Sequence, residues 1–147
     1  MTPEQKALVQ SSFTELIPIS DMAARFFYNR LFELDPKLRV LFKSDMQEQR
    51  DKLMQTIGLA VRGLDQLEAL IAPLRALGSR HAGYGVRNKD YETVGRALIG
   101  TLEALLGPKF TPETRDAWIA VYNLVASVMQ EPSIQRPTQA SPSPQLA

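Results

Sequence analysis

The sequence predicts an all-α fold, a single compact domain without a β-sheet, from three observations. Apolar residues recur at steps of three or four along nearly the whole chain, which is the spacing of one face of an α-helix. The helix start Thr-Pro-Glu occurs twice, and no segment shows the alternation of a convincing strand. A chain of 147 residues is also long enough to bury a real core within one domain.

The first third of the chain predicts two helices and a short helical piece. Thr2 is predicted to cap the first helix, with proline at the first helical position and Gln5 completing a capping box. The second helix starts at Ser20 or Asp21 and carries apolar residues at helical spacing. An Asp-Pro dipeptide ends that helix and begins a short helical piece that reaches Phe42.

The middle of the chain predicts a long amphipathic helix near 47–62, which Gly63 closes. A stripe of leucines at steps of three or four then leads to His81. Pro73 is expected to split or kink the helix that carries this stripe, because proline lacks the N–H group that a helix interior needs. Asn88 is predicted to cap the helix that follows.

The last helix and the tail complete the organisation. Gly107 stops the preceding helix, and Thr111 starts the last one, which runs to about Gln130. Beyond that point the composition becomes proline-rich and contains no aromatic residue, which is typical of a disordered segment. We therefore predict one folded domain over 1–131 and a disordered proline-rich C-terminal tail over 132–147.

Composition excludes several classes of function. With 17 basic and 16 acidic residues, the chain lacks the one-sided positive charge of a nucleic-acid binder. No run approaches the roughly 20 apolar residues of a membrane span, and the N-terminal segment has no hydrophobic signal core. We therefore expect a cytoplasmic protein that binds neither nucleic acid nor membrane. The absence of cysteine excludes iron–sulfur clusters and thiolate zinc sites, and a single histidine excludes a histidine-rich zinc site.

The one histidine, His81, admits two interpretations. Taken alone, a histidine in the last turn of a helix is more often a core or helix-ending residue, where the helix dipole favours it. The functional interpretation is an axial ligand to haem iron, because haem supplies four nitrogens itself and needs only one imidazole from the protein. A backbone carbonyl such as that of Leu77 would then hold the other ring nitrogen.

Four segments carry a family resemblance. They are RFFYNRLFELDPKLRVLF, QRDKLMQTIGLAVRGLDQLEALIAPLRALGSRHAGYGV, DYETVGRALIGTLEALLG and DAWIAVYNLVASVM. In these segments the chain resembles a bacterial globin, of the single-domain kind related to the haem domain of flavohaemoglobins, over residues 1 to about 131. The resemblance implies a globin fold, with about seven helices packed around a haem pocket, and haem b (iron protoporphyrin IX) as the cofactor.

The resemblance also implies roles for individual residues. His81 matches the proximal ligand of the iron, and Tyr28 matches the distal tyrosine whose hydroxyl reaches the bound ligand. Gln49 stands where many globins have a distal histidine, and Tyr28 and Gln49 are the residues predicted to act on the ligand. The predicted cofactor-binding residues are Phe42, Lys52, Leu53, Leu77, His81, Val86 and Tyr91. Within this set, Phe42 matches the aromatic residue on the haem face, and Lys52 a partner of a haem propionate.

The chain departs from the flavohaemoglobin pattern in two places. Flavohaemoglobins carry a glutamate that helps to polarise the proximal histidine, and its position here falls at about Ser133; Glu131 is close but out of register. The chain also ends where the reductase part of a flavohaemoglobin would begin. We therefore expect the electrons for any redox cycle to come from a separate reductase.

The resemblance implies a protein that binds dioxygen, nitric oxide and other diatomic ligands at a five-coordinate ferrous iron. The chain has no second histidine that could fill the sixth position. The leading hypothesis is a nitric oxide dioxygenase, which detoxifies nitric oxide with the help of an external reductase. The alternative is an oxygen carrier, serving oxygen transport, or a reservoir or sensor without turnover; a haem-free helical scaffold is the third interpretation. We expect a monomer or a weak homodimer.

Overall fold

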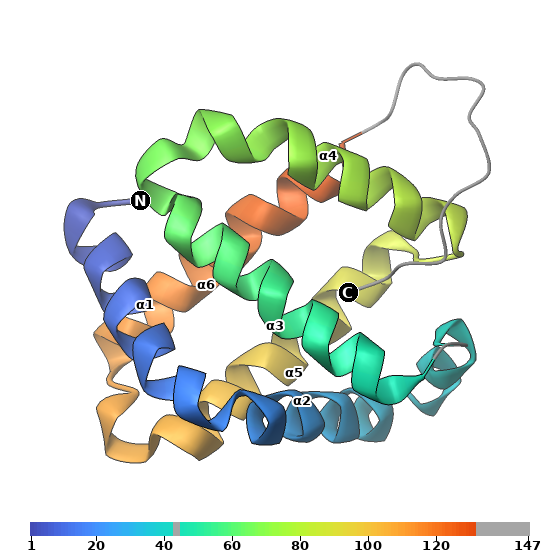
Figure 1. Cartoon of the computed structure of the whole chain (residues 1–147), viewed down its shortest axis with the longest axis horizontal. Coiled ribbons are helices and arrows are strands. Elements are labelled where there is room, and N and C mark those ends of the chain that lie inside the picture. Colours follow the sequence, from blue (N-terminus) through green and yellow to red (C-terminus); the bar gives the residue numbers. More distant parts are fainter. Residues whose placement is uncertain (43–44, 132–147) are drawn as a thin grey trace.

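The computed structural model describes residues 1–42 and 45–131, which form six α-helices (Figure 1). The helices are α1 (Pro3–Leu16), α2 (Ser20–Leu34), α3 (Met46–Arg62), α4 (Leu67–Gly83), α5 (Asn88–Leu106) and α6 (Pro112–Met129). Four short 3-10 helices join them, at Ile17–Ile19, Pro36–Leu41, Gly63–Gln66 and Gly107–Lys109. These two ranges contain no strand, which confirms the all-α prediction. The predicted tail, 132–147, lies outside the described residues.

Both Thr-Pro-Glu sequences start a helix as predicted. The Thr2 hydroxyl accepts a hydrogen bond from the Gln5 N–H, and the Gln5 side chain accepts one from the Thr2 N–H, both at 3.1 Å. At the start of α6, the Thr111 hydroxyl accepts a hydrogen bond from the Thr114 N–H at 3.2 Å. These bonds satisfy N–H groups that have no partner within the helix, so each start is encoded locally.

Pro73 does not split the helix of the leucine stripe, which was one of the two predicted effects of this proline. Helix α4 runs unbroken from Leu67 to Gly83 with Pro73 inside it. Proline removes the hydrogen bond to the carbonyl four residues earlier, which belongs to Ala69. Both Ala69 and Pro73 are exposed, so water can satisfy that carbonyl. The opposite face of α4 is held by buried leucines and tolerates the loss.

The start of α5 also differs from the prediction. Asn88 is the first residue of the helix, and Arg87 occupies the capping position instead. The reason is Asp90, whose carboxylate accepts a hydrogen bond from the Arg87 N–H at 2.9 Å. A carboxylate inside the first turn thus satisfies the N–H of Arg87, the residue just before the helix, and Asn88 follows as the first helical residue.

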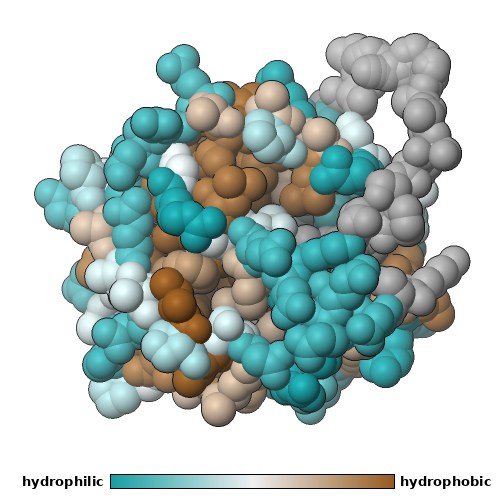
Figure 2. All heavy atoms as spheres, in the orientation of Figure 1, coloured by the Kyte–Doolittle hydropathy of each residue, from teal (hydrophilic) through white to brown (hydrophobic). Residues whose placement is uncertain are grey.

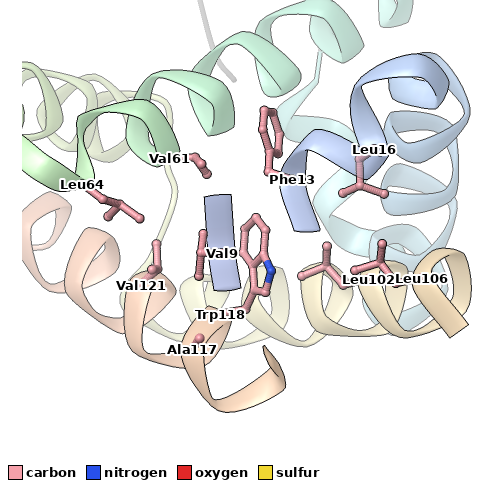
Figure 3. Close-up of a cluster of buried hydrophobic side chains, with 10 residues drawn as sticks. All are labelled: Val9, Phe13, Leu16, Val61, Leu64, Leu102, Leu106, Ala117, Trp118 and Val121. Atoms are coloured by element: carbon pink, nitrogen blue, oxygen red, sulfur yellow. The ribbon is translucent and has the colours of Figure 1, made fainter. Parts of the chain in front are cut away.

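The main hydrophobic core gathers around Trp118, whose side chain is 2% exposed (Figure 3). Its indole N–H donates a hydrogen bond to the Ser12 hydroxyl at 2.8 Å, so the one polar atom of the ring is satisfied inside the core. Apolar side chains from four helices and the adjoining 3-10 turn surround it. The buried cluster comprises Val9, Phe13, Leu16, Val61, Leu64, Leu102, Leu106, Ala117, Trp118 and Val121.

Each helix packs against its own set of neighbours (Figure 1). Helix α2 packs across α5 and against α3, while α1 and α4 both pack on α6. The contact between α4 and α6 is close at Gly78, where an added Cβ would overlap the Met129 carbonyl oxygen. Only glycine therefore lets α4 approach α6 as it does. This contact fixes the helix that carries His81.

Candidate functional site

A large cavity lies between the helices and is lined by residues of α2 to α6. Its volume, measured as the space open to the centre of a water molecule, is about 160 Å³. Its walls are almost entirely hydrophobic, which is typical of a site for a large apolar ligand. On the face shown in Figure 2, hydrophobic side chains reach the surface in the region between α3 and α4.

His81 lines this cavity from the last turn of α4. Its Nδ1 lies 2.9 Å from the Leu77 carbonyl oxygen. Because a carbonyl can only accept a hydrogen bond, Nδ1 carries a proton, and in the neutral ring Nε2 then has the lone pair. This is the tautomer in which an imidazole can coordinate a metal through Nε2, with its orientation fixed by the backbone. Leu74 and Leu77 line the same cavity one and two turns earlier.

The Gly-Tyr-Gly sequence after His81 turns the chain back towards the cavity. Helix α4 ends at Gly83, and Gly85 has φ of 98°, a left-handed conformation that glycine adopts without strain. The Val86 N–H then donates to the His81 carbonyl at 3.0 Å. This short turn places Val86 in the cavity wall beside the histidine.

Tyr28 and Phe42 contribute an aromatic section of the wall. Tyr28 is 3% exposed, and its ring meets the Phe42 ring edge-on at 5.3 Å between centroids. The rings of Phe27 and Phe32 lie 5.1 and 6.0 Å from it. Burial raises the pKa of the Tyr28 hydroxyl, and the Arg50 guanidinium opposes this only in part. The hydroxyl is therefore protonated at neutral pH and can donate a hydrogen bond.

The structure brings most of the predicted site residues together. Those that line the cavity are Tyr28, Phe42, Leu53, Leu77, His81, Val86 and Tyr91. Gln49 and Lys52 do not line it. Gln49 is 1% exposed on the buried side of α3, and Lys52 forms an ion pair with Glu48 at 3.3 Å.

Most of the wall residues were not predicted as site residues from the sequence, and Asp90 on α5 and Tyr122 on α6 are two of them. Tyr122 donates a hydrogen bond to the Tyr91 carbonyl at 2.5 Å, and burial raises the pKa of its hydroxyl. Gly95 allows this approach, since an added Cβ there would lie 2.8 Å from the Tyr122 ring. The sequence signals were weak: an acidic residue in the first turn of a helix, and an aromatic residue one turn after Trp118.

The expected position of the flavohaemoglobin glutamate, Ser133, lies outside the described residues. Glu131, its near neighbour, accepts a hydrogen bond from the Arg75 Nε at 2.6 Å. Both side chains are substantially exposed, at 41% and 60%. Glu131 therefore joins the end of α6 to α4 at the surface.

Comparison with known proteins identifies the family. The globin family model matches residues 25–129, which is most of the chain. The chain therefore belongs to the globin family, whose members bind haem. The prediction that it resembles single-domain bacterial globins and the haem domain of flavohaemoglobins is confirmed.

Relatives include both short globins and longer proteins. Neuroglobin from Danio rerio is 32% identical over 143 residues, an alignment that covers 88% of this chain and 90% of neuroglobin. Flavohemoprotein from Bordetella pertussis is 29% identical over 132 residues, again 88% of this chain but 33% of the flavohemoprotein. The chain thus spans a third of the length of that relative.

Solved structures give the same fold. An engineered carbene transferase, derived from a candidate nitric oxide dioxygenase of Rhodothermus marinus, superimposes with a TM-score of 0.80 at 28% identity. That match covers 88% of this chain and 91% of the other. A bacterial globin from Campylobacter jejuni gives a TM-score of 0.77 at 23% identity, over 88% and 94% of the two chains, which shows the fold alone.

The residues of the cavity fit haem. The walls are hydrophobic, and the His81 imidazole lines the cavity with its Nδ1 held by the Leu77 carbonyl, as in a histidine that binds a metal through Nε2. Within the part of the chain that the structure describes, no group of three or more acidic or histidine side chains could hold a metal ion by itself. None of the described helices is long and apolar enough to cross a membrane.

Proposed function

We propose that this globin binds haem b through His81 and oxidises nitric oxide to nitrate, with electrons from a separate reductase. When bound, haem supplies a five-coordinate ferrous iron that takes up dioxygen, nitric oxide or another diatomic ligand. The observation that carries the proposal is the pairing of His81 and Tyr28 in the wall of one hydrophobic cavity. The similarity to flavohemoprotein and to the Rhodothermus marinus protein supports the same reaction.

Each residue has a defined task in this proposal. His81 holds the cofactor through Nε2 while the Leu77 carbonyl fixes its ring. Tyr28 keeps its proton and donates a hydrogen bond to the diatomic ligand. Such a bond to a charged acceptor contributes about 1.5–3 kcal/mol. The hydrophobic walls keep water away from the reacting ligands and strengthen this bond.

Gln49 is proposed as a second donor to the ligand, and Lys52 as a partner of a propionate. Both lie on α3, one turn or less from Leu53, which does line the cavity. Neither side chain reaches the cavity in the structure. Their proposed roles therefore require a change of side-chain conformation when haem is bound.

The decisive experiment mixes the ferrous, dioxygen-saturated protein with nitric oxide in a stopped-flow instrument. We expect rapid formation of one nitrate per haem. The substitution Tyr28→Phe should also speed dioxygen release about tenfold to a hundredfold, because it removes the donor's 1.5–3 kcal/mol. Tyr122→Phe is the matched control, since it removes a hydroxyl from a different wall of the same cavity, and it should leave the release rate nearly unchanged.

The proposal would be wrong if nitrate formed slowly or in less than stoichiometric amounts. Equal release rates in the Tyr28→Phe variant and the unaltered protein would remove the role of Tyr28. An oxygen carrier, reservoir or sensor without turnover is the alternative. Repeated turnover with a flavin reductase and a nicotinamide donor separates the two, because a binding protein would stop after one cycle.

A further inference from the structure

Asp90 is the one charged residue among the fully buried residues that the structure describes. It is 2% exposed and lines the same hydrophobic cavity as His81. Placing a carboxylate in such surroundings is costly unless both oxygens are satisfied. The position of Asp90 therefore calls for a reason beyond packing.

Helix capping explains one of its two oxygens. Asp90 Oδ2 accepts the hydrogen bond from the Arg87 N–H at 2.9 Å and lies 3.7 Å from the Arg87 Nε. The other oxygen, Oδ1, is buried and has no hydrogen-bond partner. Arg87 is 60% exposed, so water screens much of its charge, whereas the carboxylate is shielded from water. A negative charge thus remains largely uncompensated in the cavity wall.

The local structure ties this charge to the histidine. The Val86 N–H bonds to the His81 carbonyl, and the capping bond to Arg87 follows one residue later. The turn between α4 and α5 therefore holds both side chains in the wall of one cavity. In such a hydrophobic environment a charge acts over a longer distance than it does in water.

We propose that Asp90 is a tuning residue of the haem pocket, whose buried negative charge stabilises ferric over ferrous haem and so lowers its reduction potential. Ferric haem carries one more positive charge than ferrous haem, so a nearby carboxylate favours the ferric state. A lower potential in turn makes the ferrous protein a stronger electron donor to bound dioxygen. This inference rests on haem binding in the cavity, which is one part of the proposed function, and not on nitric oxide oxidation.

The test compares the reduction potentials of Asp90→Asn and Glu92→Gln by spectroelectrochemistry. Asparagine keeps an oxygen that accepts the Arg87 N–H, so the cap survives while the charge is lost. We expect the ferrous-to-ferric ratio at a fixed potential to rise about tenfold in Asp90→Asn, an increase of about 59 mV for one electron. Glu92→Gln removes the same charge from an exposed site on α5 and should shift the potential much less.

For a second pair of variants we expect the reduction potential to change in the opposite direction. Arg87→Gln removes the positive charge that partly compensates Asp90, so it should lower the reduction potential. The control, Lys89→Gln, removes a positive charge from an exposed site two residues away and should lower the potential less. Arg87 is exposed, so this pair remains informative if Asp90→Asn does not fold. The Asp90 effect should also persist at high salt, because a buried charge is screened less than a surface charge.

Two results would overturn the proposal. One is equal potentials in Asp90→Asn and Glu92→Gln, which would leave Asp90 as a helix cap only. The other is an Arg87→Gln potential that is no lower than that of Lys89→Gln. A protein that shows the predicted shifts but forms no nitrate would contradict the proposed reaction and leave the role of Asp90 intact.

Discussion

Two phenols in the cavity wall, the buried Tyr28 and the partly buried Tyr122, keep their protons under physiological conditions. Burial raises the pKa of both hydroxyls, because the phenolate would lose its hydration. At Tyr122 the neighbouring Tyr91 raises the pKa further. The Tyr122 hydroxyl donates a hydrogen bond to the Tyr91 carbonyl, whereas Tyr28 lines the cavity with its ring packed against that of Phe42. The same chemical group therefore joins α6 to α5 at Tyr122, and on α2 it is the proposed donor to the ligand.

The raised pKa values predict a loss of stability in alkali. Above pH 10 the unfolded chain releases the tyrosine proton while the folded protein keeps it, so the unfolded state binds fewer protons. The free energy of unfolding then falls by up to about 1.4 kcal/mol per pH unit for each such tyrosine, and it is unaffected below pH 10. Urea unfolding at pH 8, 10 and 11 should show a shallower fall for Tyr28→Phe. Equal slopes for the variant and the unaltered protein would contradict this prediction.

The limits of sequence reasoning are visible at single residues. The sequence pointed to His81 as a site residue because a single histidine excludes most metal sites but is enough for haem. The family pattern pointed to Tyr28 and Phe42. Gln49 and Lys52 lie on the expected helix but do not line the cavity. The direction of each side chain depends on its neighbours in space, which the sequence does not reveal. Asp90 was missed because an acidic residue in a first helical turn is normally exposed, and its burial follows only from the turn that joins α4 to α5.

At the scale of the helix, the close contact of α4 with α6 predicts that a larger residue at Gly78 destabilises the protein. Gly78→Ala would place a Cβ on the Met129 carbonyl oxygen, a backbone atom that cannot rotate away. We expect a loss of about 1–3 kcal/mol in the free energy of unfolding, as for other overpacked sites. Haem should also dissociate faster, because the displaced helix carries His81 three residues later. Urea unfolding and transfer of haem to an acceptor protein measure the two effects.

The matched control is Gly100→Ala on α5. An added Cβ at that position meets only the Arg30 side chain, at 3.5 Å, which is an ordinary contact. Alanine is the better helix former, so this substitution should stabilise the protein by about 0.5–1 kcal/mol. If Gly78→Ala behaved like Gly100→Ala, the close approach of α4 and α6 would not be a constraint on the fold.

Helix boundaries could be predicted where a local sequence signal, such as a capping residue, sets them. They were harder to predict where packing against other helices sets them. The two Thr-Pro-Glu starts carry their own hydrogen-bond partners and were placed correctly. Pro73 was expected to split or kink α4; the helix is not split, because burial of Leu70 and Leu74 on the other face outweighs the lost hydrogen bond. The segment before Phe42 is helical as expected, yet it forms a 3-10 helix, a distinction that sequence spacing does not carry.

At the scale of the whole molecule, buried apolar contacts are distributed unevenly among the helices. The cluster around Trp118 unites α1, α3, α5 and α6. Helix α4 buries only Leu70, Leu74 and Gly78, and joins Val128 in a small separate cluster. The helix that carries the proposed iron ligand is therefore the one with the least core of its own, and the cavity lies beside it.

This distribution predicts that α4 opens first when haem is removed. Regions with few buried apolar contacts exchange their amide hydrogens through local opening, at a lower free energy than global unfolding. Haem that binds only the closed form would raise the free energy of that opening, since a ligand stabilises the state to which it binds. Hydrogen exchange on the haem-free protein should therefore show weak protection in α4 and strong protection in α6, and haem should restore α4 selectively. Equal protection of α4 and α6 without haem would contradict this prediction. It would mean that the contact with α6 alone holds α4 and that the site around His81 is formed before haem binds.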